Sequence, residues 1–133
     1  MLFQIDSSSR TPIYRQLCGQ IREAVARGRL LPESRLPSVR DLSRQLVINP
    51  NTVARVYTEL EREGVLNTRP GLGVFVAEPR SDLTKRARRD RLTALIDPLL
   101  TEAVHLGFPA EEVLALVSER MEKFQFPQAI GSP

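Results

Sequence analysis

The 133-residue chain is poor in several residue types that would each point to a particular class of protein. It has one cysteine, Cys18, so no disulfide can form within the chain, which favours a cytoplasmic protein. It has no tryptophan, two tyrosines and five phenylalanines, so the core is predicted to be mostly aliphatic. No apolar run approaches the about 20 residues that span a bilayer, and no basic-then-apolar leader opens the chain. Secretion and membrane insertion are therefore not expected.

Groups that commonly carry catalysis or hold cofactors are also scarce. The one histidine, His105, falls in an amphipathic segment, and no cysteine and histidine cluster has metal-ligand spacing. The glycines of "RPGLGV" lie in a hairpin pattern that no helix follows, so they do not match a phosphate-cradling loop. The sequence predicts a protein that is not an enzyme and that needs no cofactor and no metal.

The charge is basic in the first part of the chain and slightly acidic in the rest. Residues 1–80 hold twelve arginines, no lysine and eight acidic residues (12 − 8 = +4), whereas residues 81–133 hold seven basic and eight acidic residues (7 − 8 = −1). Arginine presents a planar fork of donors that suits phosphates and guanine edges. A bias in genome composition would explain the preference for arginine over lysine equally well.

Two helices separated by a short turn are predicted in the first part of the chain. Ser38 and Asp41 form a capping-box pattern, which begins a helix that ends near Leu46. Asn49 and Pro50 then read as the N-cap and first residue of a second helix. The apolar residues of this second helix recur at helical spacing: Val53, Val56, Tyr57 and Leu60. Two helices joined by so short a turn are typical of a helix-turn-helix.

Another helix precedes this pair, and a hairpin follows it. Thr11 and Pro12 read as the N-cap and first residue of the preceding helix, which Gly28 ends. After the pair, two short apolar segments flank a glycine-rich tip at 69–73 and predict a β-hairpin. A hairpin in this position is a wing. Residues 1–79 are therefore predicted to form a winged helix-turn-helix DNA-binding domain, mostly α with a small β wing.

The remaining residues, 80–133, are predicted to form a C-terminal tail of two helices that mediates dimerisation. The first is predicted to run without interruption from about Ser81 to His105, because the apolar stripe keeps its phase across Pro98. It is predicted to bend near Ala94–Pro98, because a proline inside a helix removes one hydrogen bond and clashes with the preceding turn. The second starts near Pro109. Two helices are too short to enclose a cavity of several hundred Å³, so pairing with another chain best explains the stripe, and packing on the chain's own winged domain is the alternative. The predicted dimer contacts are Leu92, Leu95, Leu99, Leu106, Val113, Val117 and Met121.

The start of the second helix of the pair carries polar side chains that the core does not need. In a helix-turn-helix, the N-terminal residues of this helix meet base edges in the major groove of double-stranded DNA. Asparagine pairs bidentately with adenine and arginine with guanine, although asparagine and threonine are also favoured at helix starts as caps alone. The predicted DNA-contacting residues, which come from four neighbouring elements, are Arg35, Ser38, Arg40, Asn49, Asn51, Thr52, Arg55, Arg69 and Gly71.

The stretch "LLPESRLPSVRDLSRQLVINPNTVARVYTELEREGVLNTRPGLGVFVAEP" closely resembles the DNA-binding domain of the GntR family of bacterial winged-helix transcription regulators. The short tail and the opening "FQID…PIYRQL" are similar to the YtrA type of that family. The resemblance implies a repressor that binds a palindromic operator as a homodimer and controls its own operon, commonly one that encodes a transporter. The alternative is a winged helix that binds proteins and has no specific DNA target. The sequence identifies no small-molecule effector.

In the GntR family, the residues that align with Arg40, with 49–52 and with Gly71 contact operator DNA. The chain departs from the family pattern at two positions, where Glu33 and Val47 stand in place of the usual glycine. A β-branched residue fits poorly wherever φ is positive. The two turns are therefore expected to differ locally from those of the family.

Overall fold

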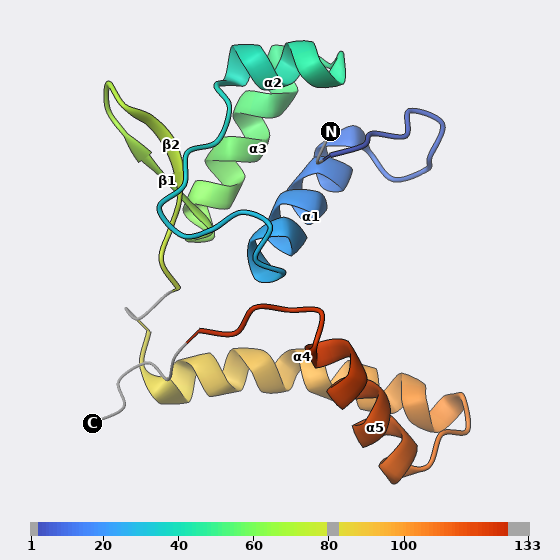
Figure 1. Cartoon of the computed structure of the whole chain (residues 1–133). Coiled ribbons are helices and arrows are strands. Elements are labelled where there is room, and N and C mark those ends of the chain that lie inside the picture. Colours follow the sequence, from blue (N-terminus) through green and yellow to red (C-terminus); the bar gives the residue numbers. More distant parts are fainter. Residues whose placement is uncertain (1–2, 80–82, 128–133) are drawn as a thin grey trace. The chain divides into compact units, whose positions relative to one another are not determined.

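Five helices and one antiparallel hairpin make up the residues that the computed structural model describes, 3–79 and 83–127 (Figure 1). The chain divides into two units, Met1–Pro79 and Arg80–Pro133. The first contains three helices and the hairpin, and the second contains two helices. Within the described ranges, no helix has both the length and the apolar character needed to cross a membrane. The predicted fold class, mostly α with a small β wing, is confirmed.

The first helix, α1 (Ile13–Ala26), begins one residue later than predicted. Pro12, not Thr11, is its N-cap, because ψ of Pro12 is still extended at 146° and no side chain caps the helix. The side chain of Gln16 instead donates to the carbonyl of Thr11 at 2.8 Å. Gly28, with φ 78°, follows the end of the helix as predicted. The buried face of α1 consists of Leu17, Cys18, Ile21 and Ala24.

The predicted helix-turn-helix is present as α2 (Val39–Leu46) and α3 (Pro50–Arg62). Ser38 caps α2, since its hydroxyl oxygen accepts a hydrogen bond of 3.0 Å from the backbone N–H three residues later. Asn49 caps α3 in the same way, at 2.8 Å from the N–H two residues later. The face of α3 predicted to be apolar is buried: Val53, Val56, Tyr57 and Leu60.

The turn between α2 and α3 places Val47 in the left-handed region, with φ 56° and ψ 51°. A β-branched side chain is unfavourable there, because its Cβ crowds the following carbonyl. Its side chain is 88% exposed, so it gains little from burial. Among the described residues, the other non-glycine residue with positive φ is Glu33, at 70°. Both departures from the family's glycine pattern therefore fall where the backbone favours glycine.

Replacing Val47 with glycine is expected to raise the free energy of unfolding by about 1 kcal/mol, since the left-handed conformation costs an L-residue about 1–2 kcal/mol and glycine loses part of that gain through its more flexible unfolded state. Val47→Ala keeps the Cβ and should recover less. Urea unfolding followed by circular dichroism measures both changes. Equal stability of Val47→Gly and the wild type would show that the turn is not strained.

The wing consists of β1 (Leu66–Arg69) and β2 (Gly73–Val76), paired antiparallel in the predicted place. The pair formed by Leu66 and Val76 is buried and joins the wing to the helices. The core of the first unit is mainly aliphatic, as predicted: Phe3, Leu17, Cys18, Ile21, Ala24, Leu36, Leu42, Val53, Val56, Tyr57, Leu60, Leu66 and Val76. Burial on this scale holds α3 and the wing in a fixed relation.

The second unit contains α4 (Lys85–His105) and α5 (Ala110–Met121). The helix α4 continues through Pro98 without interruption, as the phase of the apolar stripe predicted. It begins after Thr84, whose hydroxyl oxygen accepts a hydrogen bond of 3.0 Å from the N–H three residues later. The predicted start, Ser81, lies outside the described residues. The predicted bend near Pro98 stays a prediction.

Candidate nucleic-acid interface

The exposed face of α3 begins at its first turn. Asn51 is exposed, and its side-chain amide has no hydrogen-bond partner among the residues that the structure describes. Asn49 differs, because its side-chain oxygen is occupied by the N–H of Asn51 and only its NH₂ group remains available. Thr52 is half-buried. Of the three polar side chains predicted at this helix start, Asn51 therefore has the freest donor and acceptor pair.

Arg55 lies one turn beyond Asn51 and stacks on α1. Its guanidinium carbon is 4.0 Å from the centroid of the Tyr14 ring, a geometry in which the cation is attracted to the ring face. Desolvation raises the pKa of Tyr14, so its hydroxyl stays neutral at physiological pH. Arg55 remains exposed while it is held by this contact. Tyr14 was not among the predicted residues of this site, because only the packing of α1 on α3 brings it there.

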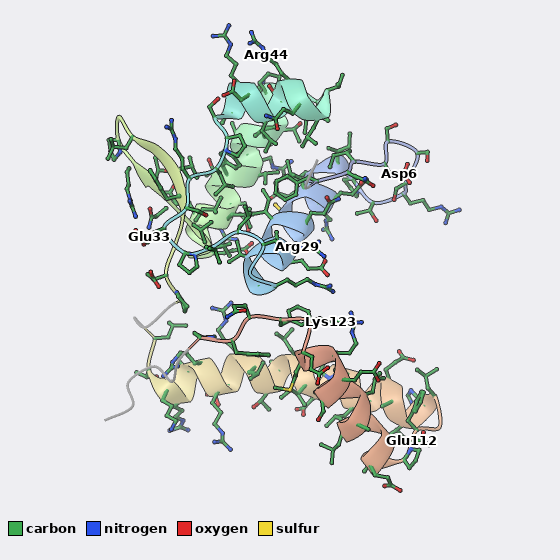
Figure 2. All side chains as sticks on the ribbon, in the orientation of Figure 1. Asp6, Arg29, Glu33, Arg44, Glu112 and Lys123 are labelled. Carbon is green, nitrogen blue, oxygen red and sulfur yellow. The ribbon has the colours of Figure 1, made fainter. Side chains whose placement is uncertain are left out.

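The helix α2 carries an exposed arginine on its first turn and another on its last turn. Arg40 lies on its first turn, exposed and without an ion-pair partner within the described ranges. Arg44 follows one turn later and projects outward from α2 (Figure 2). The N-terminus of α2 itself favours a negative group, because its first N–H groups point outward. Arg44 was not among the predicted DNA-contacting residues, although its spacing of four from Arg40 places both arginines on one side of the helix.

A buried tyrosine fixes α3 relative to the start of α2. The hydroxyl of Tyr57 donates a hydrogen bond of 2.7 Å to the carbonyl of Pro37, the residue before the cap Ser38. Burial raises the pKa of Tyr57, so the donor keeps its proton at physiological pH. This single bond connects the middle of α3 to the chain just ahead of Arg40. The two helix starts that carry the predicted DNA contacts are thus held in one geometry.

The segment between α1 and α2 runs beside β2 and is joined to it by an isolated β-bridge (Figure 1). Arg35 forms an antiparallel bridge with Phe75. Backbone hydrogen bonds of 2.8 Å join the N–H groups of Glu33 and Leu36 to β2. Since directly opposite residues of a sheet point to the same side, Arg35 lies on the face of Phe75, opposite to the buried Val76.

This outer face of the wing, formed by Arg35, Arg69, Gly73 and Phe75, contains two of the predicted arginines. Arg69 stacks on the Phe75 ring, with 4.2 Å from the guanidinium carbon to the centroid, and forms an ion pair with Glu33. Arg35 lies across Gly73, where a Cβ would come within 2.8 Å of the arginine Nε. The structure therefore brings both arginines to one face, but among the described residues only Arg69 has a carboxylate partner.

The tip of the wing is a turn that needs glycine. Gly71 has φ 77°, and the N–H of Leu72 donates to the carbonyl of Arg69 at 2.9 Å, as in a type II turn with proline second and glycine third. No atom lies within 4 Å of the place where a Cβ of Gly71 would be. The conformation, and not a lack of room, thus requires the glycine. The space around the tip is open. The contact between Gly71 and DNA stays a prediction.

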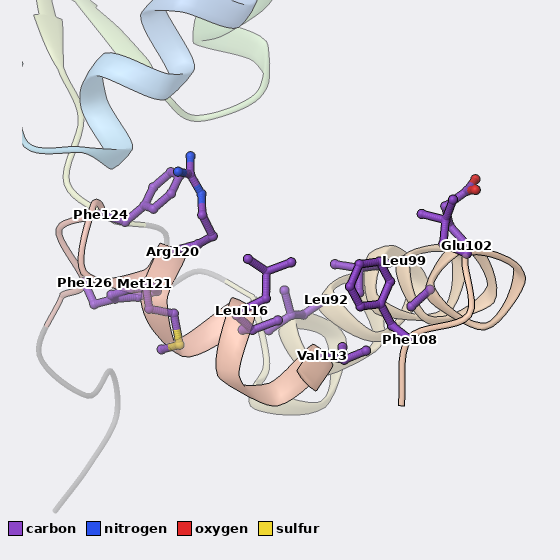
Figure 3. Close-up of a pocket in the computed structure, with 13 residues that line it drawn as sticks. Leu92, Leu99, Glu102, Phe108, Val113, Leu116, Arg120, Met121, Phe124 and Phe126 are labelled. Carbon is purple, nitrogen blue, oxygen red and sulfur yellow. The ribbon is translucent and has the colours of Figure 1, made fainter. Parts of the chain in front are cut away.

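An apolar groove of about 730 Å³ lies between α4 and α5 (Figure 3). This space is an open groove and not an enclosed cavity of the kind that two short helices were expected not to form, because α5 folds back along α4 and leaves the space between them open. Six of the seven predicted dimer contacts line it: Leu92, Leu99, Leu106, Val113, Val117 and Met121. Leu95 does not, and its side chain is 71% exposed. No described side chain of the second unit is buried.

Comparison with known proteins places this arrangement among bacterial regulators. A family model described as "Bacterial regulatory proteins, gntR family" matches residues 13–76. The HTH-type transcriptional repressor YtrA of Bacillus subtilis is 34% identical over 118 residues, which cover 89% of this chain and 91% of that protein. Among solved structures, a transcriptional antiterminator from Listeria monocytogenes EGD-e is 30% identical, with a TM-score of 0.75 and 98% of both chains covered. YtrA from Sulfolobus acidocaldarius, a GntR-family transcription factor, is 33% identical with a TM-score of 0.61, covering 76% of this chain and 99% of that one.

Proposed function

The chain belongs to the GntR family of DNA-binding transcription regulators, as a member of the YtrA type, and we propose that it is a repressor that binds a two-fold symmetric operator as a homodimer. Its relatives are transcription regulators and not enzymes, and this chain is likewise a transcription regulator and not an enzyme. The observation that carries the proposed DNA binding is the exposed side-chain amide of Asn51 at the start of α3, where Asn49 already caps the backbone N–H of Asn51. The control of its own operon, with a transporter gene, is part of the proposal by resemblance.

The proposed contacts divide into those that read bases and those that bind phosphate. Asn51 is the base reader, because an asparagine amide matches the N6 and N7 edge of adenine. Asn49 retains its side-chain NH₂ donor, and Thr52 offers its methyl group. Arg55 would extend from the Tyr14 ring toward the same major groove of the DNA. Phosphate contacts position the protein without reading sequence. They are assigned to Arg35, Ser38, Arg40, Arg44, Arg69 and the backbone at Gly71.

The homodimer is proposed because the second unit leaves its apolar side chains uncovered. Leu99 is 48% exposed, Leu106 65% and Phe108 45%, although all three line one groove. A contiguous apolar surface of this kind marks an interaction site. A second copy is the occupant that also supplies the second DNA-binding unit for a symmetric operator. Two copies joined by this groove would bury the surface that each copy exposes alone.

A footprint on the DNA upstream of the protein's own gene tests the proposed function. Purified full-length protein should protect two half-sites related by two-fold symmetry and should reduce transcription from the promoter that they overlap. Affinity should fall steeply with salt, as phosphate contacts require. Binding that prefers no sequence, or that ignores salt, would instead support a winged helix that contacts proteins.

Arg40→Ala is expected to weaken binding to operator and random DNA by a similar factor. Each phosphate contact adds about 0.9 to the slope of log affinity against log salt, so the loss of one should reduce that slope by about one unit. Arg29→Ala removes the same charge from an exposed position just beyond α1 (Figure 2) and serves as the control. Fluorescence anisotropy at several salt concentrations gives the slopes. An unchanged slope for Arg40→Ala would remove Arg40 from the phosphate contacts.

A further inference from the structure

The ion pair between Glu33 and Arg69 joins the segment ahead of α2 to the first strand of the wing. The carboxylate of Glu33 accepts a hydrogen bond from a terminal nitrogen of Arg69, whose guanidinium also stacks on the Phe75 ring. The two side chains remain 49% and 37% exposed, with Glu33 the more open. The carboxylate therefore occupies a donor of Arg69 on the outer face of the wing, where a DNA phosphate would also bind.

The backbone at Glu33 is in a conformation that favours glycine. Its φ is 70°, while its N–H donates to the carbonyl of Val76 at 2.8 Å, so β2 holds the residue in place. A residue other than glycine is destabilised in this region. Strain retained at one residue points to a role for its side chain. The partner of that side chain, among the described residues, is Arg69.

We propose that Glu33 competes with DNA phosphate for Arg69 and thereby limits the affinity of the wing for DNA. The proposal rests on the proposed DNA-binding function and assigns a control residue within it. Arg35, which has no ion pair within the described ranges, remains the wing's uncompensated charge. Arg69 can offer this terminal nitrogen to phosphate only after it leaves Glu33. Exposed ion pairs contribute little and open readily, so the pair lowers affinity without abolishing it.

Removal of the Glu33 charge is expected to tighten binding to DNA. Glu33→Gln keeps the size of the side chain and the backbone environment. It should raise affinity for a random-sequence duplex by about two- to fivefold, the range that corresponds to one exposed ion pair. Glu23→Gln is the matched control, because it changes the net charge equally and breaks the Glu23–Arg27 ion pair on α1. Its effect should be smaller and should vanish at physiological salt.

A double-mutant cycle isolates Arg69 as the group that Glu33 withholds. In an Arg69→Ala background, Glu33→Gln should raise the affinity no more than Glu23→Gln does, since the contested cation is absent. Equal gains with and without Arg69, or equal gains from Glu33→Gln and Glu23→Gln, would overturn the competition. Weaker DNA binding by Glu33→Gln than by the wild type would overturn the competition as well, because the carboxylate would then support the wing. Failure of every protein, wild type included, to bind DNA would instead refute the proposed function.

Discussion

Leu99→Glu is expected to turn the proposed homodimer into a monomer and to weaken operator binding by about a hundredfold or more, the usual loss when two linked binding modules become independent. Leu99 lines the groove between α4 and α5. A second copy seated in that groove would bury the new carboxylate without a partner, which is strongly unfavourable. The winged unit contains none of the changed contacts, so its unfolding should be unaffected. Light scattering measures the mass, and anisotropy on the operator measures the affinity.

Leu114→Glu makes the same change on α5 outside the groove. Leu114 is 70% exposed and does not line the groove, so this variant should remain a dimer and bind the operator as the wild type does. Leu95→Glu then reports whether the interface extends along α4 beyond the groove. A dimeric Leu99→Glu, or a wild type that is monomeric at micromolar concentration, would show that the groove is not the dimer interface.

Local rules were enough to predict the helix-turn-helix from the sequence. Ser38 and Asn49 mark the two helix starts because a short polar side chain satisfies N–H groups that the helix itself leaves free. Apolar spacing identified the buried face of α3. The predicted start of α1 was wrong by one residue. Thr11 is a residue type favoured at the N-cap, but Pro12 is still extended and is itself the N-cap.

Contacts between residues distant in the chain could not be predicted in this way. Glu33 and Arg69 are 36 positions apart, and their pairing depends on the β-bridge between Arg35 and Phe75, which composition does not reveal. The stacking of Arg55 on Tyr14 depends on how α1 crosses α3. Both contacts involve side chains whose type alone suggested free surface charges. A predicted DNA contact can therefore carry an intramolecular partner that changes its availability.

The apolar stripe of the second unit was predictable, but the shape it forms was not. The stripe continues through Pro98, so the helix tolerates the loss of the backbone hydrogen bond that this proline cannot donate. Whether α5 returns along α4 depends on the connection at Gly107, whose φ is 82°. The return creates the groove and separates Leu95 from the other predicted contacts. Periodicity identifies which residues share a stripe, whereas the turn decides which of them face one another.

Asn51→Ala is expected to lower affinity for the operator by about 1–3 kcal/mol, the contribution of one good bidentate base contact, while binding to random DNA changes little. The structure leaves its side-chain amide free and uses only its backbone N–H, in the cap with Asn49. Alanine keeps that N–H, so α3 should still start correctly and thermal stability should stay near that of the wild type. This pattern is opposite to that of Arg40→Ala, which should weaken both kinds of DNA together.

Operators with single base-pair changes provide the decisive control. The wild type should bind less tightly when one particular A·T pair in each half-site is replaced. Asn51→Ala should lose this discrimination, so that it binds the original operator and the operator changed at that pair with equal affinity. Discrimination at the other pairs should persist, because Asn49, Thr52 and Arg55 are unchanged. Equal losses on operator and random DNA would mean that Asn51 contacts the backbone. Unaltered discrimination at every pair would mean that the start of α3 does not read adenine through this side chain.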